Sequence, residues 1–104
     1  MVVDDKNGRN DLVTVSTTSV VLSPQMQDGV RRKSIVITNT STAGQVITIK
    51  KGYGSAIALY GLTLQPNASM VDSSISEDIL CFQGTISAIS DALNGQVSIQ
   101  EEFF

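Results

Sequence analysis

The sequence predicts an all-β fold, a single small β-sandwich of antiparallel strands with at most one short helical turn. Short runs rich in Val, Ile and Thr recur at a spacing of about ten residues, and Gly, Pro, Asn and Ser separate them. Turn signals at that spacing are typical of sandwiches and small barrels. A jelly roll and an immunoglobulin-like arrangement of the strands both fit this pattern.

The N-terminal part of the domain contains one long strand candidate followed by a loop. The candidate covers residues 12–16 and can continue as far as Leu22, because Val, Thr and Leu dominate it. Residues 23–29 come next, and their proline and Asp-Gly pair favour a turn over an extended strand. We therefore expect a loop there.

The middle of the chain is predicted to form a β-hairpin. Its first strand is residues 31–39, where a β-branched run follows three cations, and its second strand is residues 46–49. The residues between the two runs are polar, and Gly44 can adopt the positive φ that such a connection needs. The two strands are expected to pair directly with each other.

The second half of the chain contains shorter elements separated by glycine and proline. The predicted strands are residues 57–60, 62–64, 79–82, 85–89 and 97–100. Residues 73–80 are the one stretch that resembles a helix, since Ser74 and Glu77 have the spacing of a capping box. A single helical turn is the most that we expect.

The length of 104 residues corresponds to one ordinary domain with one core. We divide it into a polar N-terminal arm, residues 1–11, and a β-sandwich domain, residues 12–104. Charged residues make up 16% of the chain, whereas globular proteins average about 25%, and Ser, Thr, Asn and Gln fill the polar positions instead. Because hydroxyl and amide groups cost less to desolvate than ions, such surfaces suit contact with a neighbouring molecule.

The residue types present argue against catalytic and metal chemistry. The chain has no histidine and one cysteine, Cys81, so a Cys–His nucleophile, a zinc site and an internal disulfide are not expected. Cys81 is predicted to be a small buried residue. The adjacent acidic pairs lack the spacing of a calcium loop. We therefore expect no enzyme activity, no cofactor and no bound metal.

Charge and hydropathy also limit the expected partners. A net charge of −3 argues against nucleic acid, because binding to phosphates requires a positive field. No apolar run approaches the roughly 20 residues that cross a bilayer. We expect neither a nucleic-acid partner nor a membrane partner.

Eight residues are candidates for contact with a partner protein. The three adjacent cations either form a patch for a partner or lie in solvent at a strand end, and we prefer the second interpretation. The two terminal phenylalanines either anchor the chain in a neighbour's pocket or close the bottom of its own core. The N-terminal arm is either held by other chains or folded back on its own domain. The candidates are Asp4, Asp5, Arg9, Arg31, Arg32, Lys33, Phe103 and Phe104.

A larger pattern spans most of the chain, from Val13 to Glu101. It consists of R-K-S-I-x-I-x-N, a hydrophobic hairpin, G-x-x-L-x-P-x-x-S, G-x-I-x-A-I and a closing V-x-I-x-E. The matching residues are Arg32, Lys33, Ser34, Ile35, Ile37, Asn39, Gly61, Leu64, Pro66, Ser69, Gly84, Ile86, Ala88, Ile89, Val97, Ile99 and Glu101. In this order the pattern resembles small β-sandwich domains of tailed-bacteriophage structural proteins, such as capsid decoration and head-fibre modules.

The resemblance implies a non-enzymatic virion protein that binds the outer surface of a phage head and stabilises it. Its partners would be the major capsid protein or other virion proteins, and it would be a homo-oligomer, with a trimer favoured. It would be made in the host cytoplasm and located on the capsid surface. A tail, baseplate or head-fibre component is one alternative. A β-sandwich that binds a carbohydrate or a receptor is another, with Tyr53 or Tyr60 at the rim of its site.

Overall fold

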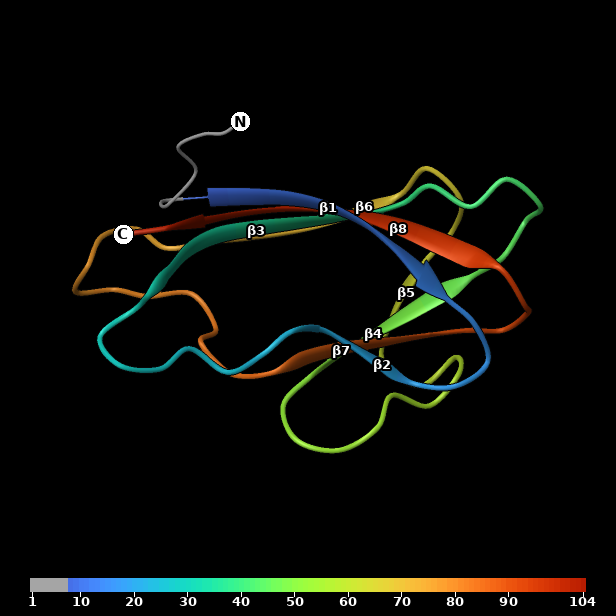
Figure 1. Cartoon of the computed structure of the whole chain (residues 1–104), viewed down its shortest axis with the longest axis horizontal. Coiled ribbons are helices and arrows are strands. Elements are labelled where there is room, and N and C mark those ends of the chain that lie inside the picture. The colour runs from blue at the N-terminus through green and yellow to red at the C-terminus, as the bar shows by residue number, and fades with distance from the viewer. Residues whose placement is uncertain (1–7) are drawn as a thin grey trace.

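Eight antiparallel strands make up the fold of residues 8–104, which are the residues that the computed structural model describes. They form two four-stranded sheets, ordered β1-β8-β3-β6 and β2-β7-β4-β5, which lie face to face (Figure 1). The strands are β1 Gly8–Val15, β2 Val20–Ser23, β3 Arg32–Asn39, β4 Ile47–Lys51, β5 Leu62–Leu64, β6 Ser69–Ser73, β7 Ile86–Ser90 and β8 Gly95–Phe103. The predicted all-β sandwich is confirmed.

The strand order is that of a jelly roll. β1 pairs with β8, β2 with β7, β3 with β6 and β4 with β5, so the two halves of the chain run antiparallel like one long hairpin. Pairing of β3 with β8 and of β4 with β7 then rolls this hairpin into two sheets. An immunoglobulin-like order would divide the strands between its sheets differently.

Alternate residues of both sheets fill the space between them. Because successive side chains on a strand point to opposite faces, one residue in two is directed inward. The buried core consists of Val15, Leu22, Ile35, Ile37, Ile47, Ile49, Leu64, Met70, Ile86, Ala88, Val97 and Ile99. β-Branched residues dominate this core, as they do in the predicted strands.

The predicted central hairpin is wrong. β3 pairs with β8 and β6, whereas β4 pairs with β7 and β5 in the opposite sheet. Residues 40–46 carry the chain across the end of the sandwich, and Gly44 has the expected positive φ, +80°. The alternation of apolar residues specifies which face of a strand is buried, but it does not specify the hydrogen-bonding neighbour.

Several predicted strand boundaries also differ from those of the structure. The first predicted strand is two strands, because residues 16–19 separate β1 from β2 and the two belong to different sheets. β1 begins at Gly8, so residues 8–11 belong to the sheet and not to an arm. Residues 57–60 and 79–82 are not strands, although Ile57 bridges Tyr60 and Ile79 bridges Ser76.

The helical turn predicted around Ser74 is wrong, since residues 8–104 contain no helix. Ser74 instead fastens a loop to β3: its hydroxyl donates to the backbone oxygen of Arg32 at 3.0 Å and accepts from the N–H of Cys81 at 2.9 Å. Serine makes such side-chain-to-backbone bonds in loops as readily as at helix ends. In the described part of the chain, no helix is long and apolar enough to cross a membrane.

Asn39 joins the two sheets where the chain crosses between them. Its side chain is fully buried, and its amide nitrogen donates to the backbone oxygens of Gln45 and Leu64, both at 2.8 Å. Its side-chain oxygen accepts from the N–H of Ser41 at 3.0 Å. These bonds connect β3 with the crossing loop and with β5 of the other sheet.

Replacement of Asn39 by alanine should lower the free energy of unfolding by about 2–4 kcal/mol, because it leaves buried backbone groups without partners. Asn10→Ala is the matched control, since Asn10 is exposed on the outside of β1. Urea unfolding followed by circular dichroism measures both variants. Equal stability of the two variants would contradict the role given to Asn39.

Candidate functional site

Two fully buried ions lie at the end of the sandwich opposite Asn39. Arg32 is 0% exposed and Glu101 is 1% exposed, and 2.7 Å separates Arg32 Nε from Glu101 Oε2. The preferred prediction, that residues 31–33 lie in solvent, is therefore wrong for Arg32. It is correct for Arg31 and Lys33, which are exposed.

Two irregularities in the sheets turn polar side chains inward. β3 has one extra residue relative to β8 between Arg32 and Ser34, so Arg32 points to the core side although strict alternation would place it outside with Ser34. β2 has an extra residue relative to β7 between Val21 and Ser23, and Ser23 is buried as a result. Bulges redirect side chains in this way.

The guanidinium of Arg32 uses all five of its N–H donors. Two of them bind side-chain oxygens at 2.7 Å, those of Glu101 and Ser23. The others bind the backbone oxygens of Pro24, Phe82 and Gly84. Because every donor has an acceptor, the burial of this charge is compensated.

Glu101 accepts hydrogen bonds from three side chains. Arg9 Nε donates to Oε1 at 2.7 Å, while Ser23 and Arg32 donate to Oε2. Arg9 is only partly exposed, also pairs with Asp11, and donates to the backbone oxygen of Leu22 at 2.8 Å. The cluster therefore ties β1, β2, β3 and β8 together.

The charge of Glu101 is stabilised by these donors. Burial alone would raise the pKa of Glu101, but the hydrogen bonds from Ser23, Arg32 and Arg9 outweigh it and hold the pKa below the ordinary value of 4.5. A carboxylate engaged in this way is not available to move a proton or to bind a ligand. The cluster is therefore structural.

The remaining candidates among the described residues form an exposed corner beside this cluster. The ammonium group of Lys33 lies 6.0 Å from the ring centre of Phe104, and the Phe104 N–H donates to the backbone oxygen of Arg31 at 3.0 Å. Phe104 is 39% exposed, and neither it nor Phe103 belongs to the core between the sheets. Asp4 and Asp5 lie outside the described residues.

The outer face of the sheet β1-β8-β3-β6 is almost free of charge. The pairing register places hydroxyl, amide and aliphatic side chains in rows across the four strands. Lys33, the extra residue in the β3 bulge, has no partner in this register and is exposed at one end of the face. Among the residues that the register places outward, Glu102 is the one ion. The others are Asn10, Leu12, Thr14, Ser34, Val36, Thr38, Ser69, Val71, Ser73, Gln96, Ser98 and Gln100. We call this surface the neutral face.

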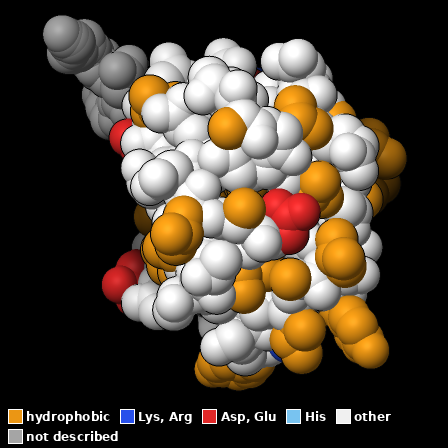
Figure 2. Space-filling model, turned by 90° about the vertical axis from the view of Figure 1, so that its right-hand side faces the viewer, with side chains coloured by type: hydrophobic (Ala, Val, Ile, Leu, Met, Phe, Trp, Pro, Cys, Tyr) orange, Lys and Arg blue, Asp and Glu red, His pale blue; other side chains and the backbone are white. Residues whose placement is uncertain are grey.

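The end of the sandwich next to the neutral face is also poor in charge. Its loops are residues 16–19, 40–46, 65–68 and 91–94, and Asp91 is their one charged residue. Figure 2 views this end, where apolar and uncharged side chains cover most of the surface. Most charged residues therefore gather toward the opposite end.

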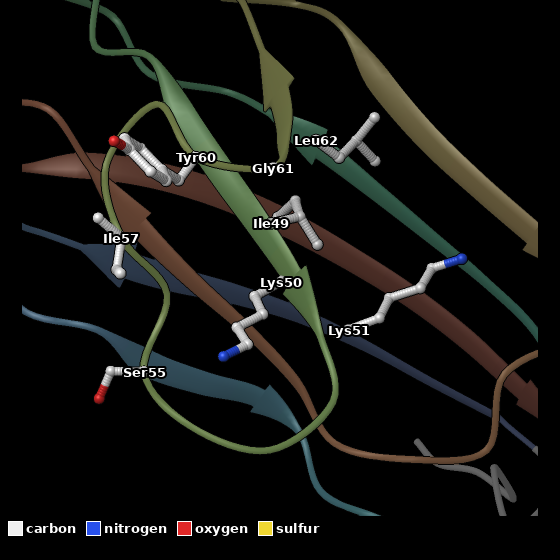
Figure 3. Close-up of a pocket in the computed structure, with 8 residues that line it drawn as sticks. All are labelled: Ile49, Lys50, Lys51, Ser55, Ile57, Tyr60, Gly61 and Leu62. Carbon is white, nitrogen blue, oxygen red and sulfur yellow. The ribbon is translucent and has the colours of Figure 1, made fainter.

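A pocket of about 600 Å³ lies beside β4 and β5. Figure 3 shows its walls, which come from both strands and from residues 52–61 between them: Ile49, Lys50, Lys51, Ser55, Ile57, Tyr60, Gly61 and Leu62. The 52–61 segment is fastened over the outside of the sheet, because Leu59 N–H donates to Thr48 Oγ1 and Ala56 N–H to Ser19 Oγ, both at 2.9 Å.

Sequence reasoning placed Tyr60 at the rim of a possible site but missed the other walls of this pocket. The signal available was the glycine content of residues 52–61, where Gly52, Gly54 and Gly61 all have positive φ. Glycines show where the backbone can turn sharply. They do not show that the segment folds back over its own sheet. Tyr53 does not line this pocket.

No family model, curated protein or solved structure matches this chain. Within residues 8–104, no group of three or more His, Cys, Asp or Glu side chains is placed to hold a metal ion. The neutral face, the exposed corner and the pocket are the surfaces from which a function can be inferred.

Replacement of Arg32 by alanine should lower the free energy of unfolding by about 3–5 kcal/mol, because it leaves Glu101 buried with much of its charge uncompensated. Arg31→Ala, one residue away and exposed, should change stability by less than about 0.5 kcal/mol. Urea unfolding of the two variants measures the difference. Similar losses in both would place Arg32 at the surface.

The free energy of unfolding should fall as the pH is lowered through the interval between the unfolded-state and folded-state pKa values of Glu101. The unfolded chain protonates Glu101 near pH 4.5 and the folded chain only at lower pH, so its contribution is complete above 4.5 and is lost as the pH falls through the folded pKa. Glu101→Gln should be less stable at pH 7 and should lose less on acidification. Unfolding titrations from pH 7 to strongly acidic pH test this, with Glu102→Gln as the matched control. Parallel pH profiles for wild type and Glu101→Gln would contradict it.

Proposed function

We propose that this protein is a non-catalytic structural protein of a virus particle, a capsid decoration protein that binds the outside of the shell and stabilises it by many repeated contacts. The observation that supports this proposal is the neutral face. The register of the four strands places thirteen side chains on that surface, twelve of them uncharged, and exposed Lys33 lies at one end of it. A surface of this kind can be covered by another protein without the desolvation of many ions.

A repeating lattice makes modest contacts sufficient. Each copy of the chain needs only a weak interaction when the copies are linked in one oligomer, because after the first copy binds the others meet the lattice at high effective concentration. A neutral face of this kind suits such binding better than it suits recognition of one small molecule, which usually requires a concave site with a few placed polar groups. The exposed corner of Lys33 and Phe104 offers an aromatic contact at the edge of the same molecule.

The fold is compatible with this role but does not determine it. Jelly rolls occur in viral capsid proteins and in sugar-binding domains alike, so they support the proposal only by analogy. The resemblance to phage decoration and head-fibre modules is a second line of support, from sequence. A tail, baseplate or head-fibre component would use the same kind of surface on a different lattice.

A carbohydrate or receptor ligand in the pocket is the other candidate function. Its volume of about 600 Å³ is that of an ordinary ligand site. Tyr60 is the one aromatic among the residues that line it, and the others are three aliphatic residues, two lysines, a serine and a glycine. Sugar sites favour several stacking aromatics and neutral polar groups, so we prefer the structural role.

The proposal is tested by mixing the purified chain with tailed-phage heads that lack it. Co-sedimentation should saturate at a fixed number of chains per shell, and decorated heads should release their DNA at a higher temperature than bare heads. Binding to tail tubes or fibres in place of heads would support the alternative role, a tail, baseplate or head-fibre component. Failure to bind any particle lattice would overturn the structural role.

Charge placed on the neutral face should weaken this attachment without unfolding the domain. Gln100→Lys with Val71→Lys should raise the dissociation constant at least about tenfold, because two ammonium groups would be buried without partners. Thr17→Lys with Thr18→Lys adds the same charge to an exposed turn outside the neutral face and is the matched control. Sedimentation assays measure the binding, and thermal unfolding verifies the fold. Equal binding by the two double variants would show that the neutral face is not the contact.

A further inference from the structure

An exposed loop carries apolar and acidic side chains together. Residues 75–80, which we call the finger, form a tight turn in which Ile75 N–H donates to the backbone oxygen of Ile79 at 2.9 Å and Ile79 N–H donates back to Ser76 at 3.2 Å. Glu77 and Asp78 occupy the tip. Ile75 is 81% exposed, and Ile79 and Leu80 are exposed as well. Exposed aliphatic groups grouped in this way indicate a contact surface.

The base of the finger is fixed to the body of the domain. Ser74 N–H donates to the backbone oxygen of Lys33 at 2.7 Å, and the Ser74 hydroxyl bonds to Arg32 and Cys81 as described above. Cys81 is half-buried there. The prediction that it is a small buried residue is therefore wrong. Because the bonds at its base and within its turn hold its shape, the finger would lose little conformational entropy when it binds.

The pocket beside β4 and β5 has the complementary chemistry. Ile57, Tyr60 and Leu62 give it an apolar wall, and Tyr60 is 75% exposed. Of its two lysines, Lys51 already pairs with Asp72 at 3.0 Å, whereas Lys50 has no carboxylate partner within residues 8–104. Glu77 and Asp78 likewise have no cation partner within those residues.

We propose that the finger of one chain inserts into the pocket of a second copy of the same chain. Ile75 and Ile79 would cover Ile57, Tyr60 and Leu62, and the acidic tip would face Lys50. The finger contributes no residue to the walls of the pocket of its own chain, and Figure 1 shows it at the end of the sandwich, apart from the 52–61 segment below the lower sheet. The contact is therefore between molecules.

This contact joins different surfaces of the two partners, so copies associate head to tail. Such a contact closes into a ring if the rotation between copies allows it. The trimer that the resemblance implies is one ring of this type. The inference does not depend on the proposed decoration role, since it concerns the association of the chain with itself in the absence of any particle.

The test is the mass of the purified full chain by analytical ultracentrifugation across a wide concentration range. We expect a multiple of the monomer mass that dissociates on dilution. Glu77→Lys with Asp78→Lys, and separately Lys50→Glu, should each weaken association at least about tenfold, because each places like charges opposite one another. Arg31→Glu reverses an exposed cation outside the pocket and is the control, with no expected change.

A charge-swapped variant distinguishes direct pairing of Lys50 with the acidic tip from a general effect of net charge on association. A chain that carries Lys50→Glu, Glu77→Lys and Asp78→Lys together restores opposite charges and should associate again. Ile75→Ser, at an exposed position, should weaken association through loss of apolar contact while the melting temperature stays unchanged. Far-ultraviolet circular dichroism and thermal melts confirm that each variant is folded.

Four outcomes would overturn the inference. The first is a wild-type chain that is monomeric at every concentration, and the second is an oligomer that the charge reversals leave intact. The third is a triple variant that does not reassociate. The fourth is an oligomer that dissociates on deletion of residues 1–7 but not in the finger variants. The last result would assign the pocket to the Val-Val-Asp-Asp segment at residues 2–5, which has similar chemistry.

Discussion

The buried ion pair between Arg32 and Glu101 is the interaction on which the rest of the structure depends. It connects β3 with β8 inside one sheet, and through Ser23 and the backbone of residues 82–84 it reaches the strands and loops of the other sheet. A buried guanidinium is tolerated only when its donors are satisfied and its charge is balanced. Each of these segments must therefore keep its place for the others to keep theirs.

The exterior of the sheet β1-β8-β3-β6 is poor in charge as well. The chain is poor in charge from the start, and two of its ions, Arg32 and Glu101, are buried. Arg9 pairs with Glu101 from a partly exposed position, and Lys51 pairs with Asp72 near the surface. Glu102 is the one ion that the strand register places on the neutral face, and Lys33 is exposed at its end. A surface that carries so few ions costs less to desolvate when another protein covers it, which supports the proposed binding role.

The fold class and most strands follow from the sequence, because alternating β-branched residues and Gly- or Pro-rich turns are local signals. The partner of each strand is not a local signal, so the sequence predicts a β3–β4 hairpin from their proximity along the chain, whereas the two strands lie in different sheets. The burial of Arg32 depends on a bulge, and a bulge exists only relative to a neighbouring strand. The pocket depends on residues 52–61 folding back over their own sheet, a long-range event. The pattern that carries the phage resemblance contains both Arg32 and Glu101, yet nothing in their spacing shows that they touch.

The most direct measurement of the central interaction is a carboxyl-detected NMR titration of Glu101 in the folded chain. The carboxyl carbon should titrate with a midpoint below 4.5, and Arg32 Nε–H should exchange slowly with solvent at neutral pH. A midpoint at or above 4.5, with rapid exchange at Arg32, would place both groups in solvent and contradict the account.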